Sequence, residues 1–119
     1  MMQVSLPGEK GPRQLDGILF KCMDETLASM MGLVAKNTIY LRVLTKYLVS
    51  RDDLPAHIED LISVMEEGFG QKSTELITKA IAKRLFSELH LSIPTQGNLS
   101  LQDYVNEAFT QSVAKLALI

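Results

Sequence analysis

The sequence predicts an all-α protein, a compact bundle of four or five helices. Apolar residues recur at steps of three and four along most of the chain, and no strand-like alternation of useful length interrupts this rhythm. Apolar residues make up 46% of the 119 residues and charged residues 22%, which is enough to supply a packed core. Trp is absent and aromatic residues make up only 6%, so Leu, Ile, Val, Ala and Met must fill that core. The length fits one domain.

The N-terminal residues 1–14 are predicted to be a flexible arm. Pro7, Gly8, Gly11 and Pro12 break regular structure there, and few apolar residues accompany them. Residues 15–119 then form the single helical domain.

A first helix is predicted to begin near Gly17, with Asp16 as its cap, and to carry an apolar stripe through Met31. Gly32 interrupts the run, and it either ends the helix or only kinks it, because a helical Gly costs only about 1 kcal/mol relative to Ala. We favour a break, since the apolar phase restarts at Val34. It continues to a second end near Ser50 through Thr38, Leu41, Leu44, Tyr47 and Leu48.

A third helix is expected to begin with Pro55 in its first turn and to close at Gly68 and Gly70. The next helix, residues 69–91, has an apolar face of about half its circumference, which is wider than a surface helix usually buries, so we expect neighbours on two of its sides. Ser73 or Thr74 is its candidate cap. Two pairs at four-residue spacing are expected to support its exposed strip: Glu75 with Lys79, and Arg84 with Glu88.

Residues 92–100 contain Pro94, Gly97 and Asn98 and are predicted to be a loop. Ser100 followed by Asp103 resembles a capping box. It opens a last amphipathic helix that runs almost to Ile119.

Charge is distributed unevenly between two neighbouring helices. Residues 36–51 hold four cations and no acid, whereas residues 54–70 hold four acids and no Lys or Arg. Screening of one helix by the other is the simpler interpretation. The alternative is that Lys36, Arg42 and Lys46 form a partner-binding face.

The same charge pattern argues against nucleic-acid binding. A formal net charge of −2 gives no overall attraction for a polyanion. The short turn after the cationic helix invites comparison with helix-turn-helix modules, but the helix that follows is acidic where a recognition helix would be cationic or polar.

The residues that could carry chemistry are few and scattered. Cys22 is the only cysteine, and His57 and His90 lie far apart in the sequence. We find no metal-ligand spacing, no phosphate-binding loop and no nucleophile with a base beside it. The sequence therefore indicates no enzyme, no cofactor and no metal.

The compartment is expected to be the cytoplasm. No apolar run approaches the ~20 residues of a membrane-spanning helix. The N-terminal residues lack the apolar core of a signal peptide.

Excess apolar surface points instead to a protein partner. Met30 and Met31 are adjacent on a helix, so one of them must face away from the main stripe. Together with the wide face of residues 69–91, this favours self-association, for example a homodimer, or a partner protein.

Ordered landmarks along the chain resemble those of a known family. They are Asp24-Glu25-Thr26-Leu27, Gly32, Lys36, Ile39-Tyr40, Leu54-Pro55, Phe69-Gly70 and Leu101-x-x-Tyr104-Val105. In this order they look like the Nitrosopumilus output domain, a small helical domain found mainly in archaea, and the resemblance spans roughly residues 16–114. It implies a stand-alone protein or an output module of signalling proteins, and it brings no catalytic residue.

The sequence thus predicts a non-catalytic interaction module of a signalling or transcription-linked system. Its candidate contact residues are Met30, Met31, Lys36, Arg42 and Lys46. The alternative is a helical pocket for an apolar small molecule, since bundles lined by Leu and Met can enclose one.

Overall fold

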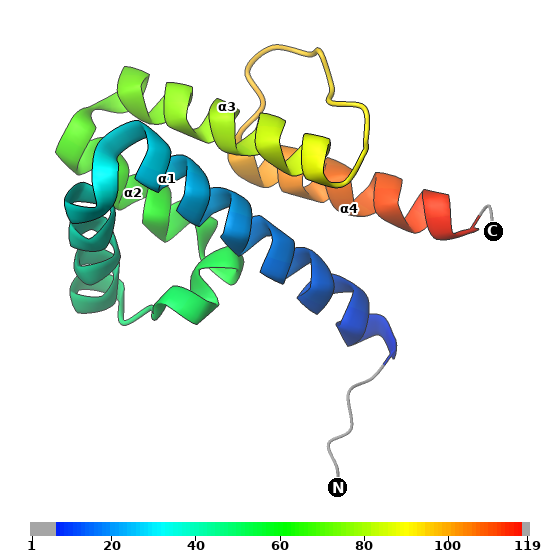
Figure 1. The fold of residues 1–119 in the computed structure, drawn as a ribbon, viewed down its shortest axis with the longest axis horizontal. Helices are drawn as coiled ribbons and strands as arrows, with labels where there is room; N and C mark the ends of the chain where they lie inside the picture. The colour runs from blue at the N-terminus through cyan, green and yellow to red at the C-terminus, as the bar shows by residue number, and fades with distance from the viewer. Residues whose placement is uncertain (1–6, 118–119) are drawn as a thin grey trace, which may run out of the picture.

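The computed structural model describes residues 7–117, with side chains from residue 15 to residue 116. Over this range the chain is all-helical, with five helical elements and no strand (Figure 1). The predicted fold class is therefore confirmed. The elements are α1 (Pro7–Tyr47), the 3₁₀ helix η1 (Arg51–Ala56), α2 (Ile58–Phe69), α3 (Gln71–Glu88) and α4 (Leu101–Ala117).

Helix α1 consists of two segments that meet at a sharp corner. Gly32 has φ 88° and ψ 165°, which lies far outside helical geometry in a region that is open essentially only to glycine. The favoured break at Gly32 is thus confirmed. It separates residues 7–31 from a second segment, residues 33–47, which we call helix 33–47 and which lies at the left edge of the molecule in Figure 1.

The N-terminal part of α1 corrects the expected boundary of the arm. The helix already begins at Pro7, so residues 7–14 are helical rather than irregular, while residues 1–6 lie outside the described range. Pro7 is compatible with this start, because the first turn of a helix leaves its amides unpaired in any case.

The connection after helix 33–47 also differs from the prediction. The helix ends at Tyr47 rather than near Ser50, and Pro55 lies in η1 rather than in the first turn of α2. Short-range bonds mark both ends of η1: the amide of Asp53 donates to Ser50 O at 3.0 Å, and that of His57 to Leu54 O at 2.9 Å. This extra turn places Leu54 and Pro55 in the core, which explains why the chain does not pass directly into α2.

A second glycine corner joins α2 to α3. Gly70 has φ 85° and ψ 169°, nearly the conformation of Gly32, and it closes α2 as the spacing predicted. The predicted side-chain cap of α3 at Ser73 or Thr74 is absent, because the helix begins at Gln71 with Gly70 at the cap position and both predicted residues lie inside it. The hydroxyl of Thr74 donates back to Gly70 O at 2.8 Å.

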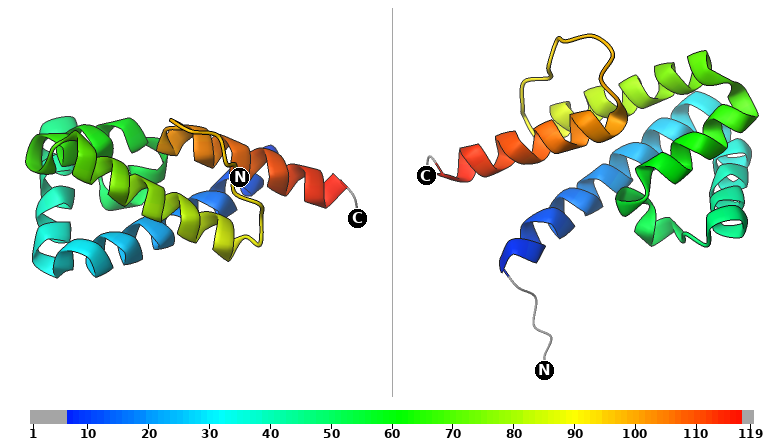
Figure 2. Two further views of the ribbon diagram at one scale, coloured as in Figure 1. Left: turned by 90° about the horizontal axis from the view of Figure 1, so that it is seen from above. Right: turned by 180° about the vertical axis from the view of Figure 1, so that it is seen from behind.

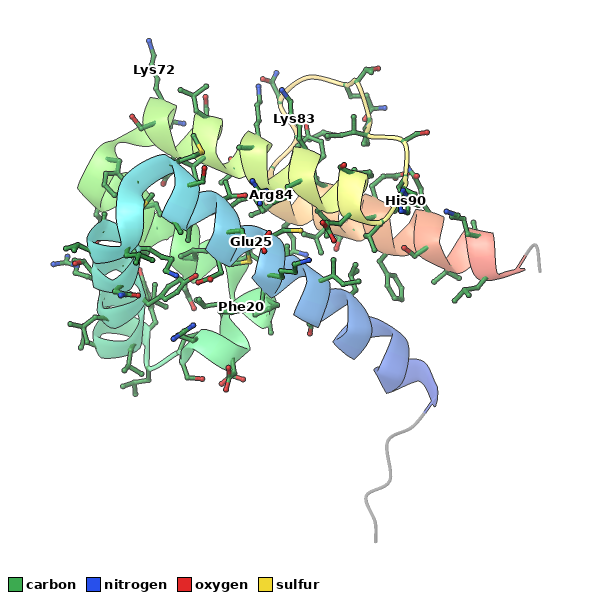
Figure 3. All side chains as sticks on the ribbon, in the orientation of Figure 1. Phe20, Glu25, Lys72, Lys83, Arg84 and His90 are labelled. Atoms are coloured by element: carbon green, nitrogen blue, oxygen red, sulfur yellow. The ribbon has the colours of Figure 1, made fainter. Side chains whose placement is uncertain are left out.

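Helix α3 packs against α1, α2 and α4, so its broad apolar face has neighbours on more than one side, as predicted. Two of its charged side chains reach across to α1 instead of pairing within α3. Arg84 contacts Glu25 at 3.0 Å, and Glu88 contacts Lys21 at 3.5 Å. Figure 3 shows Arg84 and Glu25 facing each other between the two helices.

The loop of residues 91–100 is fixed at both ends. At its start, the amide of Leu91 donates to Phe86 O at 2.9 Å and closes α3. At its end, the predicted capping box is confirmed by reciprocal bonds: Ser100 N to Asp103 Oδ2 at 3.0 Å, and Asp103 N to Ser100 Oγ at 3.1 Å. The side-chain amide of Gln111 on α4 also bonds both backbone groups of Ser92.

The body is thin for its width. Its principal extents are 43 × 41 × 20 Å, and Figure 2 shows the shallow dimension from above. One continuous core runs through it, in which α3 contributes Ile81, Leu85 and Phe86. In the described part of the chain, no helix combines the length and apolarity needed to cross a membrane.

We expect Gly32→Ala to lower the free energy of unfolding by about 1–3 kcal/mol, because a Cβ strains the backbone at φ 88°. Gly17→Ala is the matched control. Gly17 lies inside α1 with open space around a built Cβ, so the same change there should stabilise the protein by about 0.5–1 kcal/mol. Urea unfolding measures both variants, and equal effects would contradict the role of the Gly32 corner.

Candidate protein-interaction surface

Lys36 is buried at the inside of the Gly32 corner, where it contacts the helix that precedes the corner. Its Nζ lies 2.9 Å from Asp24 Oδ1, and its exposed fraction is 7%. The hydroxyl of Tyr40 donates to the same carboxylate oxygen at 2.8 Å. These bonds join the two segments of α1, so Lys36 contributes to the fold and is not accessible to a partner.

Burial and hydrogen bonding act in opposite directions on Asp24. Desolvation raises the pKa of its carboxyl, but the bonds from Lys36 and Tyr40 outweigh it and hold the pKa below its ordinary value. For the Tyr40 hydroxyl, burial and the neighbouring carboxylate both raise the pKa. Both effects favour a charged Asp24 beside a neutral Tyr40.

Arg51 completes this corner from η1. Its guanidinium carbon lies 5.7 Å from the ring centroid of Phe20 and 5.5 Å from that of Tyr40. Cations over aromatic faces are attracted at these distances. The corner cluster, which we define as Phe20, Asp24, Lys36, Tyr40 and Arg51, therefore links three segments of the chain.

Arg42 and Lys46 lie on the flank of helix 33–47 that faces α2, and both contact Glu67 there. The Arg42 contact is 3.6 Å long, and Lys46 donates a hydrogen bond to the carboxylate. The Lys46 ammonium holds the pKa of the Glu67 carboxyl below its ordinary value. The expected screening between the cationic and acidic helices is thus present.

The two methionines differ as expected from their adjacent positions. Met30 is 50% exposed, whereas Met31 is half-buried against the edge of the core. Met30 therefore adds to the accessible apolar surface beside the corner.

The main accessible apolar surface lies on helix 33–47 and continues to Leu48. At 100° per residue, eight positions fall within an arc of about 140°, and no other residue of the segment shares it. All eight are exposed and none is charged. We call this arc the outer face: Leu33, Val34, Asn37, Thr38, Leu41, Leu44, Thr45 and Leu48.

The apolar members of the outer face are large and well exposed. Leu33 is 64% exposed, Val34 82%, Leu41 59%, Leu44 45% and Leu48 85%. The opposite arc of the same helix packs into the core through Ile39, Tyr40 and Val43. Helix 33–47 is therefore apolar on both sides, and only one side is covered.

Leu48 has an unfavourable backbone in addition to its exposure. It follows the last helical residue with φ 59°, in the left-handed region where glycine is the usual residue. Its amide still donates to Leu44 O at 2.9 Å, which holds the side chain beside the outer face. A non-glycine residue in this conformation costs roughly 1–2 kcal/mol.

Two open hollows flank the outer face. One, of about 550 Å³, lies between helix 33–47 and η1 and is lined by Asn37, Tyr40, Leu41, Leu44, Ser50, Arg51 and Asp52. The other, of about 360 Å³, lies toward the end of α2, beside the 40% exposed Phe69. The outer face is therefore a ridge with a depression along each side.

The residues considered for chemistry are not brought together. Cys22 is fully buried, and burial followed by the charges of Glu88 and Glu25 raises the pKa of its thiol to about 11. His57 Nδ1 lies 3.5 Å from Asp60 Oδ2 on the surface, and His90 is exposed after α3. Among the described side chains, no group of three or more His, Cys, Asp or Glu could hold a metal ion.

The sequence interpretation missed the outer face as a surface, although its signal was present. The stripe of Val34, Leu41, Leu44 and Leu48 predicts a helix with an apolar side, but by itself it does not indicate whether that side faces the core or the solvent. The absence of charge from one whole arc of helix 33–47 was the signal that could have identified it.

Comparison with known proteins identifies no relative of this chain. No protein-family model, curated protein or solved structure matches the chain. The resemblance to the Nitrosopumilus output domain therefore rests on its sequence landmarks alone.

We expect Asp24→Asn to lower the free energy of unfolding at pH 7 by about 3 kcal/mol, because it leaves the Lys36 ammonium buried without its counter-charge. Asp24→Asn combined with Lys36→Met removes both charges and should recover much of this loss. The folded pKa of Asp24 is lowered, so its contribution is present at neutral pH and is lost as the pH falls through that pKa. Urea unfolding at pH 7 and near pH 3 tests this, and an unchanged pH dependence in Asp24→Asn would contradict it.

The Cys22 thiol should react slowly with a thiol-specific disulfide reagent at pH 8 in the folded protein and quickly in denaturant. Burial and a pKa of about 11 leave almost no thiolate in the folded state. Absorbance of the released thiolate follows the reaction. Equal rates in the folded and unfolded protein would show that Cys22 is accessible.

Proposed function

We propose that this chain is a non-catalytic protein–protein interaction module whose contact surface is the outer face. The single observation that carries the proposal is an exposed arc of about 140° with five large apolar side chains and no charge. Soluble proteins rarely leave a contiguous apolar surface of this kind uncovered. An output role in signalling or transcription is proposed from the resemblance to the Nitrosopumilus output domain.

Energetic arguments support a contact outside the monomer. Burying a fully exposed Leu or Val side chain contributes about 1.5–3 kcal/mol, so a partner that covers five partly exposed ones gains several kcal/mol. The monomer gains little from them, and at Leu48 it bears backbone strain as well. The outer face therefore contributes little to the stability of the isolated protein and more to a complex.

The charges on helix 33–47 favour a protein over a nucleic acid. Lys36 pairs with Asp24, and Arg42 and Lys46 share Glu67, so the cations are largely neutralised within the chain. Nucleic-acid affinity depends mainly on cations that are free to meet phosphates. The outer face itself offers none.

The alternative of an apolar small-molecule pocket has less support. A hollow of about 280 Å³ between α2, α3 and the following loop is open to solvent, and its lining includes Glu66, Glu75 and Lys79. Sites for apolar ligands are enclosed and mostly apolar. We therefore retain the interaction module.

A photoreactive amino acid tests the proposal at position 41. Placed there in the full chain and irradiated in cells that express it, the group should give a covalent adduct of discrete mass with a protein. Position 76 is the matched control, since Leu76 on α3 is 67% exposed, compared with 59% for Leu41, but lies outside the outer face. No adduct at position 41, or the same adducts at both positions, would overturn the proposal.

A further inference from the structure

Two apolar stripes are exposed among the described side chains, and they differ in what surrounds them. On α4, Phe109, Val113 and Leu116 are 38–71% exposed, with Lys115 within the stripe's span. The outer face is longer, carries no charge and has a hollow on either side. The absence of charge and the two hollows bear on which partner can cover it.

The first argument for the partner's identity is the absence of charge on the outer face. A partner with a strongly charged surface would need opposite charges on the outer face, and electrostatic complementarity of that kind is absent here. Arg42 and Lys46, on its flank, already share Glu67. When the outer face meets its own copy, the face itself brings no like charges together, and the hollow beside it carries one cation and one acid, Arg51 and Asp52.

Shape is the second argument. In a two-fold interface the same patch must supply both the projecting and the receiving parts. The outer face does so, because Leu41 and Leu44 project from the ridge and also line the hollow of about 550 Å³ beside it. The ridge of one copy can therefore enter the hollow of the other, and the reverse contact forms at the same time.

Residue spacing is the third argument. Val34, Asn37, Leu41, Leu44 and Leu48 follow one another at steps of three, four, three and four, the spacing of the seam between two paired helices. Asn37 is the single polar member. A single Asn in such a seam lowers the stability of the pair but fixes its register.

We infer that the outer face binds the outer face of a second copy of this chain about a two-fold axis. This inference rests on the proposed function and specifies its partner. The occupant is a second molecule of the same protein, and the interface is centred on Leu41 and Leu44.

Sedimentation equilibrium of the full chain, from low to high micromolar concentration, is the test. The unmodified protein should show a reversible monomer–dimer equilibrium. Leu41→Glu enters a two-fold interface twice, so the dissociation constant should rise by about 100-fold or more. Leu76→Glu, the same change at a comparably exposed leucine outside the face, should leave the dissociation constant within about twofold.

Leu48→Gly is a second variant of the outer face, and it tests the same interface if the Leu41→Glu protein does not fold. It removes an exposed side chain and relieves a positive φ, so it should weaken the dimer about tenfold while raising the monomer's melting temperature. His90→Gly is its control, because His90 has φ 56° away from the face; it should raise the melting temperature without changing association.

A protein that stays monomeric at high micromolar concentration would overturn the second-copy inference. So would a dimer that Leu41→Glu leaves intact, or larger assemblies that Val113→Glu on α4 dissolves. The two proposals fail separately: an adduct between position 41 and a different protein, in a chain that is monomeric, supports the interaction module and refutes self-pairing.

Discussion

The buried ion pair between Asp24 and Lys36 is the contact on which the arrangement of this molecule depends. Gly32 permits α1 to turn, but many directions are open to a glycine, and a turn alone does not select one of them. The ion pair, with Tyr40 bonded to the same carboxylate, selects one direction by joining residues on both sides of the corner. Arg51 then attaches η1 to that corner through the rings of Phe20 and Tyr40.

This corner determines which side of helix 33–47 faces the core. Burial of Lys36 on the inner arc brings Ile39, Tyr40 and Val43 with it, so the remaining leucines must point outward. The exposed surface is therefore a consequence of the same contact that fixes the fold. A change in the corner would alter stability and surface together, since both depend on the orientation of one helix.

The features predicted well from the sequence depend on residues that are close along the chain. The breaks at Gly32 and Gly70 and the Ser100–Asp103 capping box are set by local backbone chemistry. The contacts of Lys36 were not predictable in this way. A lysine is normally solvated, and only the folded corner brings Asp24 near enough to compensate for its burial. Arg42 and Lys46 lie outside this corner, so the fold does not bury them and both stay exposed.

The two corners, Gly32 and Gly70, also limit how the chain can change its length. Each joins two helices through a single non-helical residue, so the connection contains no slack. One inserted residue would turn the following helix by about 100° around its own axis and carry buried side chains out of the core. The loop of residues 91–100 can absorb an inserted residue without rotating α4, since the bonds of Ser92 and Ser100 hold the two ends of the loop in place. Insertions and deletions should therefore accumulate in that loop and be absent from both glycine corners.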